Sequence, residues 1–169
     1  MVRLIRRKTR RTQSGKVKNI RVEYLPDNKS IIATLAAWHN SMWPHGSIEY
    51  RKMHLKSQVG SRGIPTTFVA MSGKILLGSA SLVPQDLKAR QELSPWMATV
   101  FVAPEYRKKG VGSTLVNRVV LEAARLNIET VYLFTPDKEK FYAALGWLVI
   151  ERITYRGELQ SIMKIHPKS

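Results

Sequence analysis

The chain has 169 residues, enough for a single domain with a buried core, and no cysteine, which excludes disulfides and thiolate metal sites. No apolar run approaches the roughly 20 residues of a membrane span, and no apolar region follows the basic N-terminus as in a secretory signal, so we expect a cytoplasmic protein. The formal net charge of +16 is unusually high and makes an anionic partner worth considering.

The first predicted segment, residues 1–19, is a basic tail that holds half of the net charge and no acidic residue. Its composition predicts a flexible extension outside a folded domain of residues 20–169. The alternative is contact with a polyanion such as RNA, since each phosphate contact releases counterions. Such contact would be weak in sequence preference, because the tail has no aromatic residue for base stacking. The basic residues are Arg3, Arg6, Arg7, Lys8, Arg10, Arg11, Lys16 and Lys18.

The folded part is expected to begin with a strand and two helices. Residues 20–25 alternate apolar and polar side chains, which is typical of a half-buried strand. After a turn at residues 26–28, residues 30–43 repeat apolar side chains at helical spacing. The sequence Pro-His-Gly at residues 44–46 ends that helix, and residues 47–59 predict a second, highly charged helix.

A hairpin, a buried strand and a longer helix follow. Residues 66–71 and 74–83 predict the hairpin. Residues 96–103 are apolar and rich in β-branched side chains, which favours a buried strand. Residues 111–126 repeat apolar side chains at helical spacing and predict an amphipathic helix. The apolar face of that helix consists of Val111, Leu115, Val116, Val119, Val120 and Ala123.

The last predicted elements are a strand, a short helix and a hairpin. Residues 131–134 predict another buried strand, followed by a helix that Asp137 caps and Gly146 ends. Residues 147–154 and 159–165 predict the final hairpin. The complete order is β-α-α-β-β-β-α-β-α-β-β.

The loop at residues 107–112 has the sequence Arg-Lys-Lys-Gly-Val-Gly and lies between a predicted strand and a predicted helix. The first turn of a helix has free N–H groups and the positive end of the helix dipole. Glycines let a ligand approach that backbone closely, and the basic side chains add full charges, so the loop predicts a phosphate site. A dinucleotide-binding fingerprint would need a third glycine, and no run matches a P-loop.

Two motifs resemble those of the GNAT superfamily of N-acetyltransferases. The first is Arg-x-x-Gly-x-Gly at residues 107–112, preceded by a strand that closes in Val-x-Pro-Glu-Tyr. The second is Phe-Tyr-Ala-Ala-Leu-Gly-Trp at residues 141–147, in the usual order and at the usual distance. The resemblance covers about residues 20–165, is of bacterial type and identifies no substrate subgroup.

The resemblance implies an α/β (α+β) fold: a single domain with a mixed, mostly antiparallel sheet of about seven strands flanked by about four helices. It also implies an N-acetyltransferase that moves an acetyl group from acetyl-CoA to a primary amine by direct attack in a ternary complex, with CoA as product. Thr135 stands where many relatives carry Asn. The implied cofactor-binding residues are Phe101, Val102, Arg107, Lys108, Lys109, Gly110, Val111, Gly112, Ser113 and Thr135.

Tyr142 matches the position that supplies the general acid in many relatives, and its phenol can donate a proton to a leaving thiolate. The alternative is a core tyrosine on an amphipathic helix. Relatives often place the general base on the strand before the phosphate loop, but residues 96–103 contain no acid. The candidates left are Asp86, Glu92 and His39, each of which also fits an ordinary surface or core position. A water chain, or an amine that arrives neutral, stays open.

The acceptor amine is expected to enter opposite the cofactor, between the first two helices and the final hairpin, near Trp38, His39 and Trp43. The four histidines have no metal-ligand spacing, so no metal site is expected.

Two other classes of protein stay open: a nucleic-acid- or ribosome-associated protein, favoured by the charge, and a catalytically weak GNAT fold that binds CoA, favoured by the missing base. A homodimer is a further partner to consider.

Overall fold

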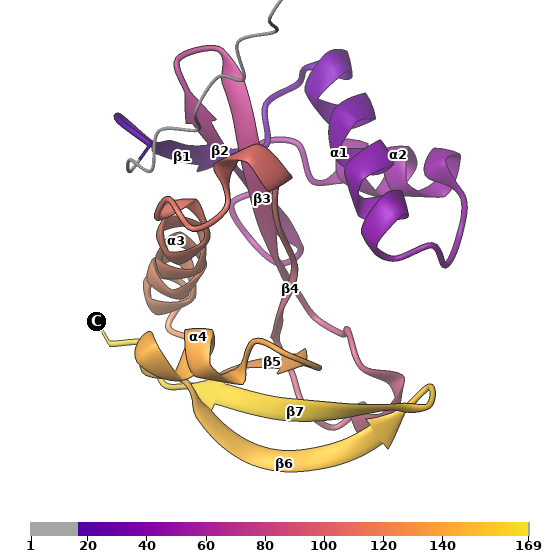
Figure 1. Cartoon of the computed structure of the whole chain (residues 1–169), viewed down its shortest axis with the longest axis vertical. Coiled ribbons are helices and arrows are strands. Elements are labelled where there is room, and N and C mark those ends of the chain that lie inside the picture. The colour runs from indigo at the N-terminus through magenta and orange to yellow at the C-terminus, as the bar shows by residue number, and fades with distance from the viewer. Residues whose placement is uncertain (1–16, 169) are drawn as a thin grey trace, which may run out of the picture.

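The computed structural model of the chain describes residues 17–168 and contains one seven-stranded sheet with four α-helices (Figure 1). The strands are β1 (Arg21–Tyr24), β2 (Thr66–Ser72), β3 (Ile75–Val83), β4 (Trp96–Val102), β5 (Val131–Thr135), β6 (Leu148–Tyr155) and β7 (Glu158–Ile165). The helices are α1 (Lys29–Met42), α2 (Ile48–Ser57), α3 (Val111–Arg125) and α4 (Glu139–Ala144), with short 3₁₀ turns at Lys88–Arg90 and Pro104–Tyr106. The predicted element order and fold class are confirmed.

The sheet has the strand order β1-β2-β3-β4-β5-β7-β6. Neighbouring strands are antiparallel except β4 and β5, which run parallel. Helix α3 covers one face of the β1–β4 half of the sheet, and α1 and α2 cover the other (Figure 1). Within residues 17–168, no helix is long and apolar enough to cross a membrane.

The side chains of strand β2 pack against different helices on the two faces of the sheet. Phe68 and Ala70 belong to the core cluster that includes α3, whereas Val69 and Met71 belong to the cluster that includes α1 and α2. Because successive side chains of a strand point to opposite faces, both alternating sets are buried, and the middle of the strand, residues 68–71, is apolar. The predicted apolar face of the third helix is confirmed, since its side chains form part of the first cluster.

A buried carboxylate ties α3 to β1 and so fixes the helix that carries the phosphate loop. Glu122 is fully buried and accepts hydrogen bonds from the Tyr24 hydroxyl at 2.9 Å, from Arg118 at 2.9 Å and from Arg125 at 2.6 Å. Burial by itself raises the pKa of Glu122, but these hydrogen bonds outweigh it and hold the pKa below the ordinary value. The carboxylate is therefore charged and fully paired.

The sequence predicts a tail of residues 1–19. Its residues 1–16 lie outside the described residues. Two of its last three residues contact the domain. The Val17 N–H donates to the Lys109 carbonyl at 3.4 Å, and the Val17 side chain packs against the core. The Ser72 hydroxyl donates to the Lys18 carbonyl at 3.1 Å. Val17 and Lys18 therefore pack on the folded part of the chain.

The start of α4 corrects one expectation. The sequence predicts Asp137 as the cap, but the helix is capped at Lys138, without a side-chain bond from the cap itself. The hydroxyl of Thr135, the last residue of β5, accepts the Lys138 N–H at 3.0 Å. Asp137 instead pairs with the Lys138 ammonium at 2.8 Å. Thr135 can reach that amide because the chain turns sharply through Pro136.

Candidate active site

The parallel strands β4 and β5 separate soon after they meet. Their register contains one pair, Trp96 with Tyr132, whereas β5 pairs with β7 on its other edge over its whole length. The second half of β4 pairs with β3, so its edge toward β5 has no strand partner among the described residues. An extended ligand can add to such an edge through backbone hydrogen bonds.

A bulge lies in the same half of β4. The register between β3 and β4 shifts between Ser79 and Ser81, which leaves an extra residue on β4 near Thr99. Thr99 has φ of +49°, a left-handed conformation that is rare for a β-branched residue. Its hydroxyl donates to the Ser81 hydroxyl at 2.8 Å, and this bond helps to hold the unusual backbone. A bulge redirects backbone groups, so it changes the direction of the N–H groups next to the open edge.

The phosphate loop ends in a left-handed glycine. Gly110 has φ of +90° and caps α3 without a side-chain bond. The first helical bond runs from the Thr114 N–H to the Gly110 carbonyl at 3.2 Å. Within the described residues the N–H groups of Val111, Gly112 and Ser113 have no acceptor, so this turn offers three donors at the positive end of a 15-residue helix.

The side chains of the phosphate loop differ in their contacts. Arg107 folds back on β4, where its Nε donates to the Val102 carbonyl at 2.9 Å. Lys108 has φ of +57° and is exposed, and Lys109 is half-buried. The Ser113 hydroxyl donates to the Gly110 carbonyl at 3.0 Å and still has lone pairs free. Arg107 therefore shapes the loop, while Lys108 projects into solvent.

Gly112 brings three parts of the candidate site together. A Cβ atom at Gly112 would meet the Phe141 ring of α4 at 3.4 Å and the Val102 side chain of β4 at 3.8 Å. The end of β4, the start of α3 and the motif helix α4 thus converge at one place, as the order of the two sequence motifs predicts.

Phe101 and Val102 face opposite sides of β4. The Phe101 ring is buried and stacks on Trp38 of α1, with ring centroids 5.2 Å apart. Val102 faces Gly112 and the α3 side. Their backbone can pair with a ligand along the open edge. Thr135 lies on β5 across that opening, but it is buried and its hydroxyl already accepts the Lys138 N–H. The hydroxyl proton of Thr135 is still available to a ligand.

Tyr142 is buried on α4, with 8% of its surface exposed. Its ring packs between Phe141 and Trp147, at centroid distances of 5.0 and 6.1 Å. The hydroxyl forms no hydrogen bond to the described residues. Burial, assisted by the nearby Asp137 carboxylate, raises the pKa of Tyr142 to about 12, so the phenol stays protonated and can act as a donor.

These features agree with a comparison against protein-family models. A model described as an acetyltransferase (GNAT) domain matches residues 64–148, which is half of the chain and includes both motifs. The chain belongs to the GNAT acetyltransferase family. No curated protein sequence matches it.

Solved structures share the GNAT fold of this chain at low sequence identity. An N-acetyltransferase from Staphylococcus aureus Mu50 has a TM-score of 0.72 at 15% identity, covering 89% of this chain and 99% of the other. The protein yncA from Salmonella typhimurium, solved with acetyl-CoA, has a TM-score of 0.70 at 15% identity, covering 88% and 94%. An aminoglycoside 6'-N-acetyltransferase complexed with coenzyme A has a TM-score of 0.70 at 15% identity, covering 88% and 98%. At these identities the likeness establishes the fold.

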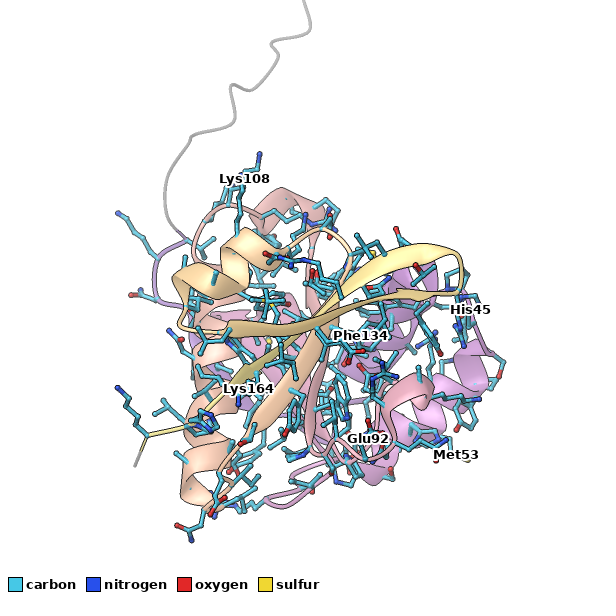
Figure 2. All side chains as sticks on the ribbon, turned by 90° about the horizontal axis from the view of Figure 1, so that it is seen from below. His45, Met53, Glu92, Lys108, Phe134 and Lys164 are labelled. Carbon is cyan, nitrogen blue, oxygen red and sulfur yellow. The ribbon has the colours of Figure 1, made fainter. Side chains whose placement is uncertain are left out.

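The GNAT domain also has a pocket of about 390 Å³ on the side of α1 and α2. Its walls come from α1, α2, the β3–β4 connection and the bulged part of β4, including Thr99. It brings together two of the three candidate bases, His39 and Asp86. Glu92 does not line it; its exposed carboxylate lies 4.0 Å from Arg90. Figure 2 shows His45, which also lines the pocket, at the right-hand edge of the molecule, away from Lys108 of the phosphate loop at the upper left.

His39 and Asp86 differ in their protonation. Burial, together with the nearby Arg51 charge, lowers the pKa of His39 to about 4, so the imidazole is neutral at pH 7. Its Nε2 shares a 2.8 Å hydrogen bond with the Ser79 hydroxyl. The Asp86 side chain meets the water of the pocket but has protein on most sides, and this burial raises its pKa to about 6. Asp86 is thus mainly a carboxylate at pH 7, with raised basicity.

Sequence reasoning missed several pocket residues. Arg51 belongs to a helix that the sequence predicts only as highly charged, and Thr99 is one residue of a predicted strand. A chain of hydrogen bonds runs from Thr99 to Ser81, from Ser81 to Thr67 at 2.7 Å, and from Thr67 to the Gln58 amide oxygen at 2.6 Å. No local pattern predicts this chain, because its members come from three different strands and the C-terminal cap of α2.

Proposed function

We propose that the chain is an acetyl-CoA-dependent N-acetyltransferase that moves an acetyl group to a primary amine by direct attack. The observation that carries this proposal is the opening between β4 and β5, bordered at Gly112 by the phosphate loop and by the helix of Tyr142. The family membership supports the reaction, and the acetyl-CoA and coenzyme A in the two related structures support the cofactor.

The residues present fit this cofactor. The free N–H groups at the start of α3 and the exposed Lys108 suit a pyrophosphate. The unpaired edge of β4 at Phe101 and Val102 suits the amide groups of a pantetheine arm, which can bond to it like an added strand. Acetyl-CoA, when bound, supplies the activated acetyl group as a thioester.

The protein's part in the transfer is positioning and proton supply. N–H groups beside the β4 bulge can stabilise the negative charge that develops on the thioester oxygen. The amine nitrogen forms a bond to the acetyl carbon as the carbon–sulfur bond breaks. The Tyr142 hydroxyl is suited to give its proton to the departing sulfur. The amine loses a proton on the opposite side, where His39 and Asp86 line the pocket.

Calorimetry with acetyl-CoA and CoA at low salt tests the first part of the proposal. We expect one binding site per chain. Thiol release from acetyl-CoA across a panel of primary amines then tests transfer. Absence of acetyl-CoA binding would overturn the enzyme assignment together with the alternative of a catalytically weak CoA-binding protein. Binding without thiol release for any amine, peptide or protein would favour that alternative.

A further inference from the structure

The pocket between α2 and the β3–β4 connection contains two charged groups of opposite sign, and neither has a counter-ion within residues 17–168. Arg51 lies on α2, and Asp86 lies on the β3–β4 connection. The two do not form an ion pair with each other, and no other ion pair involves either group within residues 17–168. Arg51 is half-buried and Asp86 is exposed at the pocket, so a ligand in the pocket can reach both and supply both counter-charges.

Arg51 is held in place by backbone groups and not by an acid. Its Nη2 donates to the carbonyl oxygens of Trp43 and, at 2.9 Å, of His45, on the connection between α1 and α2. Its Nε is buried and has no hydrogen-bond partner among the described residues. The guanidinium is thus fixed by backbone carbonyls and its charge is not balanced by an acid among the described residues, which suits an anionic group of a ligand.

Asp86 is also held in place by its surroundings. The next residue, Leu87, is 1% exposed and packs in a core cluster with Trp96 and Ile162. The preceding residue, Gln85, donates from its amide to the carbonyl oxygens of Gln91 at 2.9 Å and Leu93 at 3.3 Å. The Asp86 carboxylate accepts no hydrogen bond from the described residues, so it is free to accept an ammonium group.

We infer that this pocket receives the acceptor as a small zwitterion, with the primary ammonium group at Asp86 and an anionic group, such as the carboxylate of an amino acid, at Arg51. The inference rests on the proposed function and specifies its substrate class. The volume of about 390 Å³ suits a compact metabolite. The pocket also reaches Thr99 at the β4 bulge. An amine bound there would lie next to β4, the strand along which we propose that acetyl-CoA binds.

The other polar groups that line the pocket do not supply these counter-charges. His39 is neutral at pH 7 and bonded to Ser79. The rings of Tyr50 and His54 on α2 pack against each other, with centroids 4.2 Å apart. The two tilted rings provide an aromatic wall for the body of the ligand, and the two charges fix its ends.

The test uses the full chain, saturating acetyl-CoA and thiol release. Each of the twenty amino acids is compared with its amide and with its decarboxylated amine, for example phenylalanine, phenylalaninamide and phenethylamine. We expect at least one amino acid to exceed both of its analogues in kcat/KM by at least about tenfold, since each analogue lacks the anionic group. The amine of the amide has a lower pKa than the amine of the amino acid, so more of it is neutral at a given pH. A faster reaction of the amino acid than of its amide therefore cannot result from a larger fraction of neutral amine.

Variants then assign the two ends. Arg51→Met should reduce the preference for the amino acid to about twofold or less, while Arg51→Lys should keep part of it. Asp86→Asn should raise KM for the amino acid and for both analogues by at least about tenfold. Glu92→Gln is the matched control, because Glu92 is an exposed carboxylate of the same connection outside the pocket, and it should leave all three values unchanged. Thermal unfolding checks that each variant folds.

The outcomes separate the inference from the proposed function. Acetyl transfer to amines without an anionic group, as fast as to any amino acid, would overturn the zwitterion inference and leave the acetyltransferase assignment intact. Transfer to peptides alone would have the same meaning. Absence of acetyl-CoA binding would overturn both. If Arg51→Met does not fold, the comparison of acceptors in the wild-type protein decides by itself.

Discussion

At the scale of single residues, the candidate site depends on two side chains whose ionisation is set by burial. Tyr142 is a phenol kept protonated on the motif helix α4, and His39 is an imidazole kept neutral in the pocket on the side of α1 and α2. Both pKa shifts have desolvation as their largest cause. Each shift therefore has a consequence that can be measured.

Replacing Tyr142 by phenylalanine removes the proton donor and keeps the packed ring. We expect kcat to fall by at least about tenfold, because a positioned acid typically contributes 10²–10⁴-fold. Acetyl-CoA affinity and the melting temperature should stay near the wild-type values, since the interaction is made mainly in the transition state. Tyr155→Phe is the control, because Tyr155 packs against Phe134 on β5. A wild-type kcat in Tyr142→Phe, with chemistry rate-limiting, would show that Tyr142 is only a core residue.

His39 should make the protein less stable in mild acid. Its pKa is about 4 in the folded state against 6.5 as the ordinary value, so the unfolded chain binds more protons between these limits. Stability from His39 is therefore lost as pH falls from about 6.5 toward 4. The free energy of unfolding in urea at pH 7 and pH 5 should differ less in His39→Gln than in the wild type. His54→Gln, at an exposed position of α2, should not change that difference.

The effect of pH on stability through Asp86 is opposite to the effect through His39, so the two contributions must be measured separately. Its folded pKa of about 6 lies above the ordinary 3.8, so the folded state binds more protons in this window and gains stability as pH falls. Asp86→Asn should consequently stabilise the protein at pH 7 and lose that advantage below about pH 4. An Asp86→Asn variant that is less stable than the wild type at pH 7 would show that the carboxylate has a stabilising partner.

At the scale of elements, the first turn of α3 carries the strongest expectation about the cofactor. Its free N–H groups and the left-handed Gly110 lie beside Gly112, where the end of β4 and helix α4 come close. Cofactor binding should therefore be more sensitive to charge in this turn than to a small increase in volume.

Gly112→Asp should weaken acetyl-CoA binding by at least about tenfold, because a carboxylate would lie against the phosphates in place of a free backbone. Gly112→Ala is the matched control. Its Cβ atom would meet Phe141 at 3.4 Å, an ordinary contact, so its affinity should stay much closer to that of the wild type. Calorimetry measures both affinities, and thermal unfolding shows whether each variant is folded. An affinity of Gly112→Asp within about twofold of the wild type would mean that the phosphates bind elsewhere.

At the scale of the whole molecule, the net charge of +16 is divided between the domain and the segment that precedes it. Val17, the residue after that segment, pairs with Lys109 of the phosphate loop. We propose that residues 1–16 add affinity for a polyanion such as RNA without taking part in acetyl transfer.

Deleting residues 1–16 should leave turnover of a small amine within about twofold of the wild-type value, because the deletion keeps Val17 and all the elements that border the site. Affinity of the full chain for RNA should fall by orders of magnitude between about 50 and 200 mM salt, and the deletion should remove most of it at low salt. Filter binding and thiol release measure the two effects. A large loss of turnover would instead assign this segment to the catalytic domain.

The sequence alone determined the order of elements and the position of the phosphate loop. These depend on local signals: apolar spacing along residues 111–126, glycine at residues 110 and 146, and basic side chains before a helix. Most boundaries differ by one or two residues, because side chains such as Thr135 supply caps that the pattern of Asp137 does not predict. The family resemblance follows from the same local segments.

Only the tertiary structure decided how the site is assembled. The separation of β4 from β5 depends on the pairing of β5 with β7, a strand far along the chain. Arg51 and Asp86 share one pocket because α2 and the β3–β4 connection pack on the same side of the sheet. The left-handed Thr99 is held by a hydroxyl on the neighbouring strand. None of these has a local signal, since each results from contacts between residues far apart in sequence, and a sequence pattern reports only what neighbouring residues prefer.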